Sequence, residues 1–195
     1  MIVALFGVTC VGKTTIGRVI SDELNCEFYD LDSAFTSYFN DTIENLQRRF
    51  FLGNEYDHQK GIVLKSIIGK CSSNTIIAMS PIYYTMSYKH LFTSRDVFSI
   101  VLQDTPENIA RRVIYTDAND NIIENPVTDY SAEIKDIKYF IARYKSAFSK
   151  IDNHYFIDGK SAEDAASDIV IHYALREKMS GQISTLPPQR LATRS

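Results

Sequence analysis

The segment LFGVTCVGKTTIGRVI, near the start of the chain, contains a spacing of residues that can hold phosphate groups. Residues 7–14, called the phosphate loop below, match the pattern G-x-x-x-x-G-K-[ST]. Its glycines let the backbone turn tightly, so that N–H groups and the positive end of the next helix approach phosphate oxygens. Lys13 can then reach the β- and γ-phosphates, and the Thr14 hydroxyl can bind Mg²⁺. The residues expected to bind the nucleotide are Gly7, Val8, Thr9, Cys10, Val11, Gly12, Lys13, Thr14 and Thr15.

A second candidate for chemistry is the pair of carboxylates in CEFYDLD, which follows the first helical segment. Alternation along a strand predicts that Asp30 and Asp32 lie on the same side, at the carboxyl end of the sheet, where open α/β proteins form their sites. One carboxylate near Thr14 can hold Mg²⁺ through water, and the other can orient a substrate hydroxyl or accept its proton. The alternative is that Asp32 only caps the helix after the strand, because Asp is a favoured N-cap residue.

The elements that must position these residues alternate between strands and helices. The apolar segment MIVALF predicts a buried strand before the phosphate loop, and KTTIGRVISDEL has helical spacing directly after it. Further strands are expected in CEFYDLD, TIIAMS, VFSIVLQ and HYFID. Thr105, with Pro106 at the next position, and Ser161 are expected to cap helices. Five strands alternating with helices predict an α/β fold, with a parallel sheet covered by helices on both faces.

Composition excludes several classes of partner. A chain of 195 residues is in the range of one domain, and its net charge of -3 and pI of about 5.8 give no basic face for nucleic acid. No apolar stretch is long enough to span a bilayer and no signal peptide is recognisable, so we expect a cytoplasmic protein without a membrane partner. Three cysteines without metal-ligand spacing indicate reduced thiols. We expect a monomer or weak dimer.

The segment GVTCVGKTTIGRVISDELNCEFYDLDSAF resembles the start of a shikimate kinase, from the phosphate loop to a strand that ends in spaced aspartates. The resemblance resumes in GNEYDHQK, in TPENIARRV and in RYKSAFSKIDNHYFIDGKSAEDAASDIV, and ends at about residue 174. It implies the nucleoside-monophosphate-kinase type of phosphate-loop NTPase fold. The implied reaction is transfer of the ATP γ-phosphoryl group, with Mg²⁺, to a hydroxyl of a small molecule.

The resemblance also implies a division into parts. Residues 1–178 would form the kinase domain, with a small substrate subdomain at about 32–60 and a lid at about 115–131. Periodicity is lost after this, so residues 179–195 are expected to form a flexible tail.

By resemblance, the catalytic residues are Lys13 and Asp32, and the metal site is formed by Thr14 and Asp30. Arg112 matches the family arginine that lies against the adenine, so it joins the nucleotide-binding residues. The residues that match the family's substrate site are Asp32, His58 and Arg143. For Arg143 a surface charge on an amphipathic helix is an equal alternative.

The chain departs from the family pattern on the acceptor side. His58 stands where the family has an arginine, and Ser80 and Pro81 stand where it has glycines. Residues 115–142 contain no arginine, so a lid arginine over the phosphates is missing. Lys135 or Lys138 could replace it, but lysine lacks the bidentate fork of arginine. The nucleotide half of the family pattern is kept, and we predict a poor shikimate kinase with another acceptor.

Three interpretations stay open. The first is a shikimate kinase-like enzyme whose acceptor is uncertain, with Tyr83, Tyr84 and Tyr88 as an aromatic wall for a flatter acceptor such as a nucleoside. The second is a nucleotide kinase, in which Arg48 and Arg49 would meet an acceptor phosphate. The third is a non-catalytic module that binds ATP as a switch.

Overall fold

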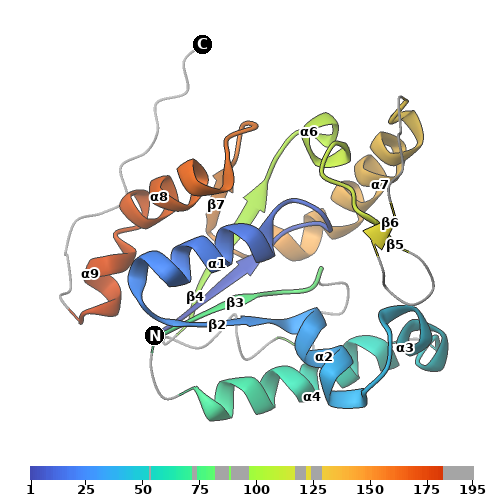
Figure 1. The fold of residues 1–195 in the computed structure, drawn as a ribbon, viewed down its shortest axis with the longest axis horizontal. Helices are drawn as coiled ribbons and strands as arrows, with labels where there is room; N and C mark the ends of the chain where they lie inside the picture. The colour runs from blue at the N-terminus through green and yellow to red at the C-terminus, as the bar shows by residue number, and fades with distance from the viewer. Residues whose placement is uncertain are drawn as a thin grey trace.

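A five-stranded parallel sheet forms the centre of the molecule in the computed structural model (Figure 1), as the sequence predicts. The structure describes residues 1–52, 54–71, 74–81, 88, 97–116, 122–123 and 129–181. The strand order is β2-β3-β1-β4-β7. The strands are β1 (Ile2–Phe6), β2 (Glu27–Asp30), β3 (Thr75–Ala78), β4 (Val97–Gln103) and β7 (Asn153–Phe156).

Helices cover the sheet on both faces (Figure 1). On one face α1 (Lys13–Leu24) packs against α8 (Ala162–His172), and α4 (Glu55–Lys70) lies on the other. The remaining described helices are α2 (Leu31–Phe39), α3 (Ile43–Arg49), α6 (Pro106–Ala110), α7 (Ser131–Phe148) and α9 (Leu175–Met179). Two short antiparallel strands, β5 (Tyr115–Thr116) and β6 (Ile122–Ile123), lie in the segment expected to be a lid.

The central position of β1 determines where the phosphate loop lies. All five β1 residues are buried, because β1 pairs with β3 on one side and β4 on the other while helices cover both faces. A continuous apolar run is what such a strand requires. The loop that follows β1 therefore emerges at the middle of the carboxyl edge of the sheet, where the direction of strand succession changes.

The predicted helix caps are confirmed where they were specified. Thr105 accepts a hydrogen bond from the backbone N–H of Asn108, with Pro106 directly after the cap. Ser161 accepts one from the backbone N–H of Asp164. The chain after this cap forms two helices, because Ala174 adopts a left-handed φ of 49° between α8 and α9.

One expectation about β2 is corrected. The strand ends at Asp30, and α2 begins at Leu31, so Asp32 lies on a helix and not on a strand. The chain turns here because the Asp30 carboxylate accepts a hydrogen bond from the backbone N–H of Ser33 and so caps α2. The cap is Asp30, and Asp32 lies in the first turn of the helix.

Some predictions fall on residues that the structure does not describe. Tyr83 and Tyr84 are among them, and so are residues 182–195 of the expected tail. Residues 117–121 and 124–128 of the expected lid also lie outside the described part. In the described ranges, no helix is both long enough and apolar enough to cross a membrane.

Candidate active site

The phosphate loop has the backbone that its glycines predict. Gly7 has φ of 144° and Gly12 has φ of 111°, and Gly12 is the residue from which α1 starts. Cys10 also has a positive φ, 62°, which residues other than glycine adopt at a cost. A Cβ atom on Gly7 would lie 2.7 Å from the carbonyl oxygen of Leu102, so β4 allows no side chain at this turn.

A Gly7→Ala variant is expected to lose stability. The new methyl group would meet a backbone atom in a strained conformation, which costs about 1 to 3 kcal/mol. Thermal unfolding should show a Tm lower by several degrees. Gly69→Ala is the matched control, because a Cβ atom there meets no atom within 4 Å, and its Tm should equal or exceed that of the wild type. Equal Tm values for the two variants would contradict the tight approach of the loop to β4.

Lys13 lies inside the phosphate loop. Its Nζ donates hydrogen bonds to the carbonyl oxygens of Gly7 at 3.1 Å and of Val8 at 2.8 Å. Burial lowers the pKa of Lys13 to about 8, although the charges of Asp32, Cys10 and Asp30 act in the opposite direction. The ammonium group is therefore poorly solvated and lies within electrostatic reach of both predicted carboxylates. A poorly solvated ammonium group is suited to bind phosphate oxygens.

Thr14 and Asp30 meet directly. The Thr14 hydroxyl donates a hydrogen bond of 2.6 Å to Asp30 Oδ2, while Oδ1 of the same carboxylate caps α2. A hydroxyl and a carboxylate at this distance can share one hard cation, the hydroxyl as a ligand and the carboxylate through water. No group of three or more His, Cys, Asp or Glu side chains suited to a metal occurs in the described ranges, so an ion here would depend on nucleotide phosphates and water for its other ligands.

Asp32 is held by two residues from other elements. Its Oδ1 lies 2.5 Å from Lys60 Nζ, on α4, and accepts a hydrogen bond of 2.7 Å from Ser80, which follows β3. Burial raises the pKa of Asp32, but the charge and hydrogen bond of Lys60 and the hydrogen bond of Ser80 outweigh it, so the pKa is lowered. Asp32 is therefore a carboxylate, and it lies within electrostatic reach of Lys13.

Lys60 is the site residue that sequence analysis missed. Its signal was nevertheless present, because Lys60 precedes Val63, Leu64 and Ile67 at the spacing of one buried helical face. A lysine in such an apolar stripe requires a partner. Burial lowers the pKa of Lys60, but the charge of Asp32 more than compensates, so the pKa is raised.

The structure does not bring His58 to Asp32. His58 is exposed, and it is two residues away from Lys60, which places the two side chains on nearly opposite faces of α4. The basic group that α4 presents to Asp32 is Lys60.

Arg112 contacts the phosphate loop. Its guanidinium group lies 2.8 Å from the fully buried Asp104 carboxylate and donates to the carbonyl oxygen of Val11 at 3.4 Å. Asp104 also accepts hydrogen bonds from the backbone N–H of Thr105 and from the side chain of Asn108. Arg112 is thus fixed between the end of β4 and the loop, beside the expected nucleotide site.

Of the other predicted residues that the structure describes, three arginines are exposed and one tyrosine is buried. Arg143 is exposed on α7 and donates a hydrogen bond of 2.7 Å to the Tyr139 hydroxyl. Arg48 and Arg49 are exposed on α3, where Arg48 pairs with Glu44. Tyr88 is fully buried, so it belongs to the core and not to an open wall.

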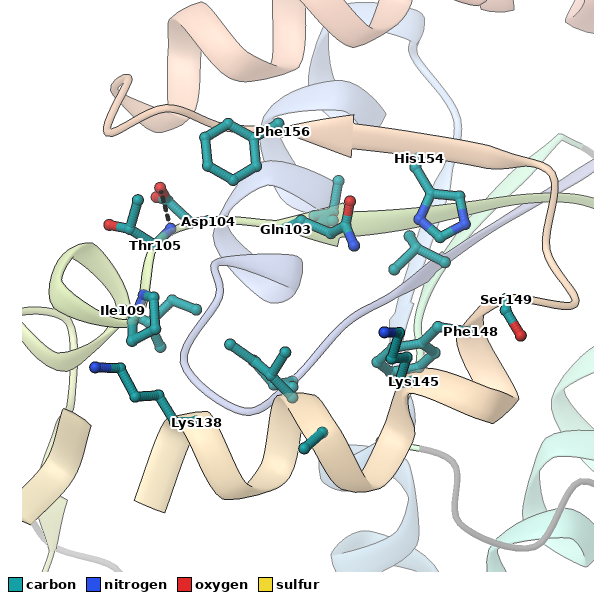
Figure 2. A pocket seen from close by; sticks show the side chains of 16 residues that line it. Gln103, Asp104, Thr105, Ile109, Lys138, Lys145, Phe148, Ser149, His154 and Phe156 are labelled. Carbon is teal, nitrogen blue, oxygen red and sulfur yellow. Dashed lines mark hydrogen bonds between the residues drawn. The ribbon is translucent and has the colours of Figure 1, made fainter. Parts of the chain in front are cut away.

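A separate cavity of about 930 Å³ lies between α7 and the strands β4 and β7 (Figure 2). Lys138 and Lys145 reach it from α7, and His154 and Phe156 reach it from β7 (Figure 2). Val8 is the single residue of the phosphate loop among those that line it. Because Lys13, Thr14, Asp30 and Asp32 do not line this cavity, it is not the place where the phosphates and carboxylates meet.

Comparisons with known proteins point to one family. The family model described as shikimate kinase matches residues 9–174. A shikimate kinase from Pseudoalteromonas atlantica is 31% identical over 144 residues, which cover 62% of this chain and 84% of the relative.

Solved structures agree on the fold. A shikimate kinase from Bacteroides thetaiotaomicron has 17% identity and a TM-score of 0.70, covering 89% of this chain and 98% of its own. The Acinetobacter baumannii shikimate kinase, solved in complex with shikimate, has 19% identity and a TM-score of 0.66, covering 91% and 94%. A gluconokinase from Sinorhizobium meliloti has 12% identity and a TM-score of 0.55, covering 93% and 97%.

Proposed function

Because the chain belongs to the shikimate kinase family and is a small-molecule kinase, we propose that it transfers the ATP γ-phosphoryl group to a hydroxyl of a small polyol for which shikimate is a poor substitute. The family assignment already disfavours the non-catalytic alternative. The proposal therefore concerns the role of each residue and the nature of the acceptor.

The observation that carries the proposal is the junction of the phosphate loop with the helix that carries Asp32. Thr14, the residue after Lys13, donates a hydrogen bond of 2.6 Å to Asp30, and Asp30 caps α2, whose first turn contains Asp32. Phosphoryl transfer needs little covalent chemistry from the protein, but it needs a cation on the phosphates and a group that orients the nucleophile. We assign the first requirement to Lys13 and the second to Asp32.

We assign the steps as follows. Lys13 stabilises charge on the β- and γ-phosphates, and Asp32 accepts a hydrogen bond from the acceptor hydroxyl. The hydroxyl oxygen bonds to the γ-phosphorus, the bond from that phosphorus to the bridging oxygen breaks, ADP leaves, and the hydroxyl proton passes to Asp32 or to water. Thr14 and Asp30 would hold Mg²⁺, which would neutralise charge on the phosphates.

The basic residues near the expected acceptor site are the reason why we propose that shikimate is a poor acceptor. Lys60 is nearly buried and its charge is paired with Asp32, so it offers little to an acceptor carboxylate. His58 is exposed on the other side of α4. A carboxylate is bound best by fixed guanidinium groups, and Arg143 on the exposed side of α7 is the arginine that we keep as a candidate for the acceptor.

The other expectations stay proposals. These are contact of Arg112 with the adenine, a substrate subdomain at 32–60, a lid at 115–131, a cytoplasmic location, and a monomer or weak dimer without nucleic acid or membrane partners.

The test is steady-state kinetics with ATP against shikimate, gluconate and common nucleosides. We expect kcat/KM for shikimate to be lower than for the best acceptor by tens to thousands of times, because loss of one partner of a desolvated charge pair has about this effect. Efficient turnover of shikimate, with the highest kcat/KM of the panel, would show that the departures from the family pattern leave the acceptor specificity unchanged. Preference for a nucleoside would contradict a polyol acceptor and favour the flatter acceptor that the first interpretation allows.

A further inference from the structure

Lys60 and Asp104 are the buried charged residues of the part of the chain that the structure describes. Asp104 belongs to the anchor of Arg112, described above. Lys60 has no role in the proposed transfer, and yet its ammonium group lies one contact away from the carboxylate that performs it. A buried cation needs an opposite charge and hydrogen-bond acceptors close to it. The partners of Lys60 therefore indicate its role.

Three polar atoms, one of them a carboxylate oxygen of Asp32, form a closed triangle. Lys60 Nζ lies 2.5 Å from Asp32 Oδ1 and 3.0 Å from Ser80 Oγ, and Ser80 Oγ lies 2.7 Å from the same Oδ1. The three residues come from α4, α2 and the end of β3. The triangle therefore joins three elements at the first turn of α2, where Asp32 lies.

Two aromatic rings also lie close to the ammonium group of Lys60. Lys60 Nζ lies 4.5 Å from the centre of the Tyr56 ring and 5.6 Å from that of Phe35. Tyr56 is on the same helix as Lys60, and Phe35 is on the same helix as Asp32. Ring faces attract an ammonium group, so the two rings add to the contacts that hold Lys60 in place.

The two oxygens of Asp32 differ in their surroundings. Oδ1 accepts from Lys60 and Ser80, whereas Oδ2 receives no hydrogen bond from the residues that the structure describes. The Asp32 side chain is 44% exposed, while that of Lys60 is 6% exposed. The carboxylate thus extends from a buried anchor toward open space.

We infer that Lys60 is a positioning residue, which, together with Ser80, holds Asp32 by Oδ1 and so leaves Oδ2 to the acceptor hydroxyl. This inference rests on the proposed function of Asp32. Lys60 itself does not touch the acceptor, because its head group is buried and its contacts go to Asp32, Ser80 and the rings.

The test is a double-mutant cycle with Lys60→Met, Asp32→Asn and the combined variant, assayed with ATP and the best acceptor of the panel above. Lys60→Met should lower kcat about 10- to 100-fold, because a misplaced catalytic group has an effect of this order. KM for both substrates should change by less than about threefold. The combined variant should be no slower than Asp32→Asn alone, since a positioning residue has nothing left to position.

Two more variants complete the design. Ser80→Ala removes one donor to Oδ1 with a small change in volume, so it should fold and lower kcat about threefold to tenfold with KM unchanged. Lys65→Met, on the exposed side of the same helix, is the matched control and should leave kcat and KM unchanged. If Lys60→Met does not fold, Ser80→Ala in the same cycle with Asp32→Asn decides the question.

The outcomes separate the two ideas. If the wild-type protein turns over no acceptor, the proposed function fails, and the positioning role with it. If the wild type is active but the losses of Lys60→Met and Asp32→Asn multiply, or if KM for the acceptor rises in place of a fall in kcat, the positioning role alone is overturned.

Discussion

Replacement of Lys13 by alanine should reduce phosphoryl transfer by about a hundredfold or more while the fold stays intact. The ammonium group neutralises charge that spreads over the phosphates in the transition state, and loss of one such preorganised contact has about this effect. Burial lowers the pKa of Lys13 to about 8, which means that the folded state disfavours the charged form of this side chain. Removal of the ammonium group should therefore leave the folded protein stable. Steady-state kinetics and thermal unfolding of the purified variant measure the two effects.

The matched control for this prediction is Lys65→Ala. Lys65 is exposed on α4, so the control removes a lysine of the same length from the same protein at a distance from the phosphate loop. Its turnover should equal that of the wild type. Wild-type turnover by a folded Lys13→Ala protein would show that the phosphate loop does not perform the chemistry.

Asp32→Asn should lower kcat by about a hundredfold to ten-thousandfold, which is the range for loss of a group that takes up or directs a proton. Affinity for ATP and Mg²⁺ should change little, because Asp32 is held by Lys60 and Ser80 and not by Thr14. Asp30→Asn should give the opposite pattern, since Asp30 contacts the Thr14 hydroxyl, and should raise the Mg²⁺ concentration needed for half-maximal rate.

The measurement is kcat as a function of Mg²⁺ and ATP concentration for both variants. Assays are best done well below the unfolding temperature of Asp32→Asn, because this variant leaves the Lys60 charge buried without its partner. Normal binding of MgATP and normal turnover in both variants would mean that the two carboxylates serve only to cap and join elements.

The parts of the fold that could be predicted are those that depend on neighbouring residues. The apolar run of β1, the glycines of the phosphate loop and the caps at Thr105 and Ser161 are local signals, and the structure agrees with each of them. The end of β2 was less predictable. Asp30 and Asp32 are equally good caps by residue type, and the one that caps is decided by where the strand loses its pairing with β3.

The anchor of Asp32 could not be predicted in the same way. Lys60 is 28 positions away from Asp32 in the chain, and Ser80 is 48 positions away. They meet because α2 packs on α4 and because β3 lies beside β2. Family likeness directed attention to His58, two residues from Lys60, and only the orientation of α4 tells the two side chains apart.

The left-handed backbone at Cys10 has a practical consequence for anyone who wishes to remove the thiols of this protein for site-specific labelling. Serine and alanine, the usual replacements, keep a Cβ atom in a conformation that disfavours it, and valine adds branching. Glycine adopts φ near 62° without this cost. A labelling variant is therefore best built with glycine at position 10, whereas Cys26 and Cys71, whose φ angles are not positive, accept the ordinary substitutions.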